Sequence, residues 1–202
     1  VENKANRPNN DDVGDHNVTV TVTDGDVTVS NTWTIRVINT SDPPVWSNDS
    51  VGAVNQIAPD SNGNPGTASV GSVYSYTPAA TDPDTQHGDV LSYSYSGSLP
   101  SWLQWNSTHK RLENKVNRPN NGDVGVHNVT VVVEDVDNHS SGQNNRVEKS
   151  FTITVNNVND IPSFTSTPTY SLNEDVYYNY TPTASDIDSQ VVSGTTLSFS
   201  VP

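Results

Sequence analysis

The chain begins with VENKANRPNNDDVGDHNVTVTVTDG (residues 1–25), and nearly the same stretch returns as LENKVNRPNNGDVGVHNVTVVVEDV (residues 112–136). The two stretches align without a gap and are identical at 18 of 25 positions. The match resumes at residues 33–46 and 151–164, after a loop that is seven residues longer in the second copy. Because self-similarity at a fixed spacing is typical of tandem modules, the repeat predicts several small domains rather than one large one.

Linkers rich in Asp and Pro divide the chain further. They predict the C-terminal part of a module A (1–44), a complete module B (45–162) and the N-terminal part of a module C (163–202). Modules B and C support each other, since VYSYTPAATDPD at 73–84 matches YYNYTPTASDID at 177–188. We expect the chain to be a window in a longer array. The alternative is a filament in which the end of one chain completes the start of the next.

Alternation of apolar and polar residues predicts β-strands. Only 31% of the residues are hydrophobic, but they occur in alternating runs such as NVTVVVE at 128–134, which bury one face of a strand. Segments 58–70 and 137–146 have the composition of loops. The predicted strands of module B are 52–57, 73–79, 90–96, 101–106, 110–115, 126–135 and 147–157. This pattern predicts an all-β chain of antiparallel β-sandwich modules.

Composition excludes several classes of function. The net charge is −14, from nine Lys and Arg against 23 Asp and Glu, which argues against binding to nucleic acid or to an anionic membrane surface. No stretch approaches the roughly 18 apolar residues of a membrane span, so we expect no membrane insertion. The chain has no cysteine, and motifs such as Gly-x-Ser-x-Gly and His-Glu-x-x-His are absent. We therefore expect no enzyme.

Five short motifs occur together in and around module B. They are Tyr74-Ser75-Tyr76, ATDPD at 80–84, LPSWL at 99–103, Asp123-Val124-Gly125 and VNDIP at 158–162. In this combination the chain resembles the bacterial cadherin-like, dystroglycan-type immunoglobulin-like repeats of large extracellular adhesins and surface proteins. The resemblance implies Ig-like or cadherin-like sandwiches, an extracellular or cell-surface location, and Ca²⁺ bound between modules. One departure is ENKVNRPNN at 113–121, where the family usually has a Gly-Thr-Pro turn.

The resemblance also implies which residues bind calcium. Ca²⁺ takes six to eight oxygen ligands, and an Asp-x-Asp turn offers two carboxylates at one point. Carried over position by position, the ligands between A and B are Asp12, Asn39, Asp42, Asp82, Asp84 and Asp135. Those between B and C are Asp123, Asn157, Asn159, Asp160, Asp186 and Asp188, together with an Asp expected beyond residue 202.

Two substitutions distinguish these junctions. Ser41 stands where the second junction has Asn159, and Val70 stands where module C has Glu174. We therefore expect the A–B junction to bind fewer ions, or to bind them more weakly. The competing interpretation is that these are ordinary turn residues, because Asp and Asn side chains cap nearby backbone groups.

Two functions fit these observations. The first is a non-catalytic structural or adhesive repeat of an extracellular fibre or giant surface adhesin, stiffened by Ca²⁺, with neighbouring modules or other copies of the chain as partners. The alternative is a carbohydrate-binding or homophilic recognition module of a secreted multidomain protein, with a glycan or cell-surface ligand. That alternative requires Trp102 and Trp105 to be exposed beside the 58–70 loop. We expect Trp102 or Leu103 to fill the core instead.

Overall fold

The computed structural model describes residues 7–47, 66–136, 145–190, 194 and 196–201. Within these residues the elements are β-strands and short 3-10 helices, with no α-helix, so the all-β prediction is confirmed. The chain divides into two compact units, which we describe separately. Unit 1 comprises Val1–Asn48, Ala79–Ser94 and Val132–Lys149, and unit 2 comprises Asp49–Pro78, Tyr95–Val131 and Ser150–Pro202.

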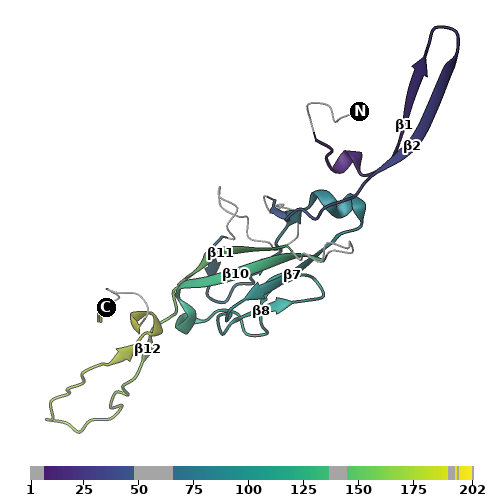
Figure 1. Ribbon diagram of the computed structural model, residues 1–202. Helices are drawn as coiled ribbons and strands as arrows, with labels where there is room; N and C mark the ends of the chain where they lie inside the picture. The colour runs from purple at the N-terminus through teal and green to yellow at the C-terminus, as the bar shows by residue number, and fades with distance from the viewer. Residues whose placement is uncertain (1–6, 48–65, 137–144, 191–193, 195, 202) are drawn as a thin grey trace. The chain divides into compact units, whose positions relative to one another are not determined.

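Figure 1 shows the described strands and 3-10 helices in the order in which they follow one another along the chain. The 3-10 helices are η1 (Asn10–Asp12), η2 (Pro83–His87), η3 (Asn121–Asp123) and η4 (Ile187–Gln190). The strands are β1 (Gly14–Thr23), β2 (Thr28–Val37), β3 (Val45–Trp46), β4 (Ala68–Ser69), β5 (Ser75–Tyr76), β6 (Ala80–Thr81), β7 (Val90–Ser96), β8 (Leu103–Asn106), β9 (Arg111–Asn114), β10 (Gly125–Val136), β11 (Arg146–Asn156), β12 (Ser163–Phe164) and β13 (Ala184–Ser185).

The strands form one four-stranded sheet, one three-stranded sheet and three two-stranded pairs. The order in the four-stranded sheet is β4-β11-β10-β7, and in the three-stranded sheet it is β5-β9-β8. The pairs are β1-β2, β3-β6 and β12-β13. Figure 1 shows β10 lying beside β7 and β11 in the larger sheet.

Unit 1 contains a long antiparallel hairpin. Strands β1 and β2 pair over ten residues, from Gly14 opposite Val37 to Thr23 opposite Thr28. Asp24 sets the turn between them, because its Oδ1 accepts hydrogen bonds from the amides of the two residues that follow Gly25, at 3.1 and 2.8 Å. This is the local capping for which Asp is favoured in turns.

Unit 2 contains an aromatic core. The ring of Tyr74 packs edge-on against Trp102 with centroids 5.5 Å apart, and Tyr76 packs against Phe151 at 5.3 Å. Trp102 is 3% exposed and Leu103 is 1% exposed, so the prediction that this segment fills the core is confirmed. The remaining buried apolar side chains of unit 2 are Ala68, Leu112, Val129, Val131, Ile153 and Val155.

Most predicted strands of module B agree with the structure to within two residues, and two predictions are wrong in part. The predicted strand 73–79 contains only β5 at 75–76, because Pro78 has no amide hydrogen to donate to a ladder. The predicted loop 58–70 contains β4, which pairs in parallel with the end of β11. The predicted strand 52–57 and most of the loop 137–146 lie outside the described residues.

Candidate metal centres

Three aspartates of unit 1 converge at one turn. Asp82 is the N-cap of η2, and its Oδ1 accepts a hydrogen bond from the Asp84 amide at 2.8 Å. Gly88 ends η2 with φ 108°, a conformation that favours glycine, and Asp89 then donates its amide to the Asp84 carbonyl at 3.3 Å. One carboxylate oxygen from each of the three aspartates lies within 4.8 Å of the others, and all three residues are buried.

Two residues far away in the sequence bind Asp84. The backbone amide of Asp42 donates to Asp84 Oδ2 at 2.6 Å. Asn10 Nδ2 donates to Asp84 Oδ1 at 3.1 Å and to Asp42 Oδ2 at 3.3 Å. Both oxygens of a side chain that is 0% exposed therefore accept hydrogen bonds from other segments of the same unit.

Asp135, at the end of β10, lies in the same region. Its Oδ2 accepts a hydrogen bond from Ser41 Oγ at 2.9 Å, and Ser41 Oγ accepts one from Asn145 Nδ2 at 2.8 Å. The charge of Asp135 also acts on Asp82. We call the set of unit 1 residues that meet here the first acidic cluster; it consists of Asn10, Asp42, Asp82, Asp84, Asp89 and Asp135.

The environment of Asp82 disfavours the negative charge of its carboxylate. Burial raises the pKa of Asp82, and the charges of Asp135, Asp84 and Asp89 raise it further, against the hydrogen bond from the Asp84 amide. Among the described residues, Asp82 Oδ2 and both polar side-chain atoms of Asn39 are buried with no hydrogen-bond partner. Each buried polar atom without a hydrogen-bond partner lowers the free energy of unfolding by about 1–3 kcal/mol. Carboxylate and amide oxygens are ligands for hard divalent cations.

A second acidic cluster in unit 2 repeats the arrangement. Asp188 follows Asp186 as Asp84 follows Asp82, and its amide donates to Asp186 Oδ1 at 2.8 Å. The Asp160 amide donates to Asp188 Oδ2 at 2.6 Å. Asn121 Nδ2 donates to Asp160 Oδ2 at 2.7 Å and to Asp188 Oδ1 at 3.4 Å, and Asn157 Nδ2 donates to Asp188 Oδ1 at 2.8 Å. We call these five residues the second acidic cluster.

The other four predicted ligands are not among the residues of the two clusters. Asn39 is buried, and its side-chain polar atoms have no hydrogen-bond partner among the described residues. Asp12 Oδ2 accepts a hydrogen bond from the Asn9 amide at 3.1 Å, and Asp123 Oδ2 accepts one from the Asn120 amide at 3.0 Å. Both carboxylates thereby close capping boxes on η1 and η3. Asn159 is exposed and donates to the carbonyl of the next residue at 2.8 Å. Their roles as ligands stay predictions.

Sequence reasoning missed three members of the clusters. Asn10 and Asn121 are equivalent positions of the repeat and carry the same residue in both copies, which is the signal that could have found them. The linker and turn motifs drew attention to the neighbouring Asp12 and Asp123 instead. Asp89 belongs to no repeated motif, and only the chain reversal at Gly88 brings it to Asp84.

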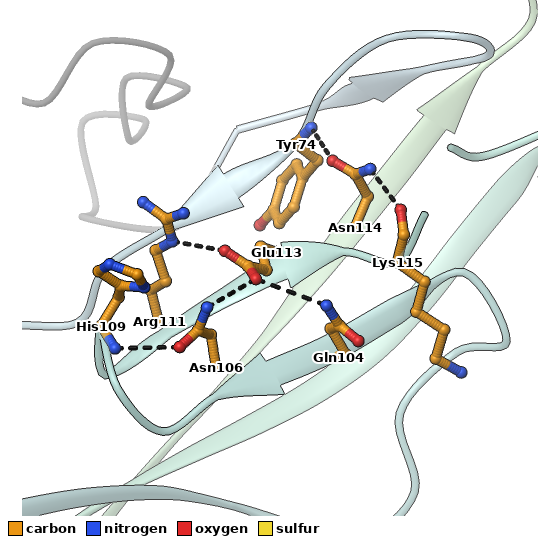
Figure 2. Close-up of polar contacts among 8 residues, drawn as sticks. All are labelled: Tyr74, Gln104, Asn106, His109, Arg111, Glu113, Asn114 and Lys115. Atoms are coloured by element: carbon orange, nitrogen blue, oxygen red, sulfur yellow. Dashed lines mark hydrogen bonds and ion pairs between the residues drawn. The ribbon is translucent and has the colours of Figure 1, made fainter. Parts of the chain in front are cut away.

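The recognition alternative places its ligand near Trp105, on the β8–β9 hairpin, and one face of this hairpin is polar. On the β8–β9 hairpin, Glu113 accepts hydrogen bonds from Arg111 at 2.6 Å, Asn106 at 2.8 Å and Gln104 at 3.4 Å (Figure 2). Burial raises the pKa of Glu113, but the hydrogen bonds from Asn106 and Arg111 outweigh it and hold the pKa below its usual range. Trp105 lies opposite Leu112, on the other face of the hairpin, and is only half-buried.

These observations weigh against a stacking platform for sugars. Trp102 is buried, and within the described residues the only other tryptophan of the LPSWLQW segment, Trp105, faces the same side as a fully buried leucine. The exposed face of the hairpin carries amides and charges that already bind one another.

Comparison with known proteins agrees with the fold. Residues 57–156, just under half of the chain, match the family model described as "He_PIG: Putative Ig domain". No significant match was found among curated proteins. Mouse protocadherin-24 EC1-3 is similar with a TM-score of 0.54 at 15% identity, covering 91% of this chain and 59% of that chain. Protocadherin gammaB7 EC3-6 is similar with a TM-score of 0.53 at 18% identity, covering 89% and 44%.

An endo-fucoidan hydrolase from glycoside hydrolase family 107 is also similar, at 22% identity with a TM-score of 0.36, covering 75% of this chain and 20% of that chain. At this score we draw no conclusion from it. The chain spans less than two thirds of the length of each of these three structures. The chain therefore has an all-β, Ig-like and cadherin-like fold.

The described part of the chain contains no helix that is long and apolar enough to cross a membrane.

Proposed function

We propose that the chain is a non-catalytic structural and adhesive segment of an extracellular fibre or large surface adhesin, stiffened by Ca²⁺ at its two acidic clusters. One observation carries the proposal: buried oxygens of Asp82, Asp84 and Asp89 lie within 4.8 Å of one another. Atoms that bind one Ca²⁺ at about 2.4 Å are at most about 4.8 Å apart. The spacing therefore suits ligands of a single ion.

The electrostatics favour a divalent cation at this position. Two like charges about 4 Å apart repel by roughly 4 kcal/mol at an effective dielectric constant near 20. A Ca²⁺ ion among the carboxylates replaces this repulsion by attraction. Because the ligands are assembled only in the folded state, binding stabilises that state by about 2.7 kcal/mol when the free calcium concentration is 100 times Kd.

The origin of the ligands explains how an ion stiffens the chain. In the first acidic cluster, Asn10 and Asp42 belong to the predicted module A, while Asp82 and Asp84 belong to the predicted module B. An ion held by both sets restrains the linker between the modules. The extracellular location and the adhesive role rest on the resemblance to cadherin-like surface repeats and on the cadherin-like fold.

Calcium binding is testable by thermal unfolding of the chain in calcium and in chelator, with magnesium as a second ion. We expect millimolar calcium to raise the melting temperature in a saturable way. In X-ray scattering, the distribution of radii of gyration should be narrower in calcium than in chelator. Magnesium should act more weakly, because it demands a small octahedral site and retains its waters. A melting temperature that does not change up to millimolar calcium would refute the proposal.

A further inference from the structure

An amide bridges two carboxylates of the first acidic cluster. Asn10 Nδ2 lies 3.1 Å from Asp84 Oδ1 and 3.3 Å from Asp42 Oδ2. Ionised carboxylates only accept hydrogen bonds, so the amide must face both of them with its NH₂ group. Asn10 is half-buried and Asp84 is fully buried, which strengthens a charge-assisted hydrogen bond.

The same bridge occurs in the second acidic cluster. Asn121 Nδ2 lies 2.7 Å from Asp160 Oδ2 and 3.4 Å from Asp188 Oδ1. Asn121 is 8% exposed, and Asp188 is 3% exposed. Since the contact is made twice, by repeat-equivalent residues in two separate units, it is a regular part of the junction rather than an incidental contact.

We propose that Asn10 and Asn121 are positioning residues that keep the carboxylates of each cluster together when no cation is bound. Each amide places a positive hydrogen on two carboxylates that would otherwise repel, and it thereby offsets part of the repulsion. A cation then meets ligands that are already ordered, so less conformational freedom is lost on binding. This last consequence rests on the proposed function, whereas the bridge itself does not require calcium.

The test is a double-mutant cycle in chelator, using the full 202-residue chain. Asn10→Ala should lower the melting temperature by about 3–12 °C, the range expected for loss of a hydrogen bond to a charged group in a chain of this length. In an Asp42→Asn background its effect should be clearly smaller, because one of the two charges is gone. Asn121→Ala and Asp160→Asn form the matching cycle. Asn10→Asp should lower the melting temperature more than Asn10→Ala, since it removes the donor and adds a charge.

Asn9→Ala is the matched control. The Asn9 side chain accepts a hydrogen bond from the Asp11 amide at 2.8 Å and caps η1 without bridging carboxylates. Its effect on the melting temperature should add to that of Asp42→Asn within about 1–2 °C, as expected for uncoupled sites. An unchanged melting temperature for Asn10→Ala, or strict additivity with Asp42→Asn, overturns the bridge. Failure of calcium to stabilise the unmodified chain overturns the proposed function and leaves the result of this cycle standing.

Discussion

The two acidic clusters have the same arrangement of turn, linker amide and asparagine, but they differ in charge. In both, an Asp-x-Asp turn meets a linker amide at 2.6 Å and an asparagine bridges two carboxylates. The first cluster adds the carboxylate of Asp89, and no aspartate stands at the corresponding positions 189–196 of the second. In the second, Asn157 adds another amide donor to Asp188, whereas the equivalent Asn39 has no hydrogen-bond partner among the described residues.

On the proposed function, this difference predicts that the two clusters depend on a cation to different degrees. Amide donors around Asp188 already compensate part of its charge. The first cluster concentrates more negative charge in a buried position, so on the proposed function it should gain more from an ion. The substitutions Ser41 and Val70 predict weaker binding at the first junction, while Asp89 predicts stronger binding there. Measurement of the two sites separately decides between them.

The largest effect should come from removing calcium. The amides of Asp42 and Asp160 are matched reporters, since each donates to a turn carboxylate at 2.6 Å. Chelation should accelerate hydrogen exchange of the Asp42 amide about tenfold more than that of Asp160, equivalent to roughly 1.4 kcal/mol of additional local stabilisation by the ion. Asp84→Asn should abolish the calcium dependence at Asp42 and leave that at Asp160.

Asp26→Asn, in the exposed β1–β2 turn, is the control for loss of one charge and should leave both dependences intact. Equal changes at the two reporters on chelation would remove the basis for distinguishing the clusters.

The next effect is a pH dependence specific to the first cluster. The pKa of Asp82 is raised in the folded state, so the folded chain takes up this proton more readily than the unfolded chain. Without calcium, the associated stability is present below about pH 4, the unfolded pKa, and is lost as pH rises through the folded pKa. With calcium the sign reverses, because the ion requires the ionised carboxylate.

Melting temperatures in chelator and in calcium, recorded between about pH 4 and pH 7, test this trend. The difference between the unmodified chain and Asp82→Asn isolates the contribution of this group from other titrations. A difference that is independent of pH would contradict the assignment.

The smallest effect concerns the position at which the linkers differ. Ser41 Oγ is hydrogen-bonded to Asp135 and Asn145, whereas Asn159 is exposed and bonds only to the neighbouring carbonyl among the described contacts. Ser41→Ala should therefore destabilise the chain by about 1 kcal/mol in chelator, and Asn159→Ala by less than about 0.5 kcal/mol. Denaturant unfolding of both variants gives the comparison. A larger loss from Asn159→Ala would reverse the ranking of the two linkers.

The repeat and the turn motifs predicted much of this structure. Alternation located β7 to the residue and β10 and β11 to within one residue, because side chains of a half-buried strand must follow a period of two. The Asp-x-Asp turns and the linker aspartates Asp42 and Asp160 were predicted to meet, and the structure brings them into contact.

What the sequence did not reveal depends on tertiary placement. Asn10 and Asn121 each follow an N-cap asparagine, so the sequence gives them no role beyond the turn. Only the fold shows that their amides reach carboxylates far away in the sequence. Asp89 likewise required knowledge of the chain reversal at Gly88. The break at Pro78 was visible in the sequence, since proline removes a donor wherever it falls.

The pairing of β4 with β11 has a consequence under tension. Ala68 and Ser69 run parallel to Val155 and Asn156, so a pull on the chain before β4 and after β11 drives the two strands past each other in opposite directions. The slanted, evenly spaced hydrogen bonds of a parallel pair then share the load instead of opening one after another. Resistance to such a pull is set by the rate of unfolding rather than by equilibrium stability. On the proposed function, a pull along the chain therefore loads this short parallel contact in shear.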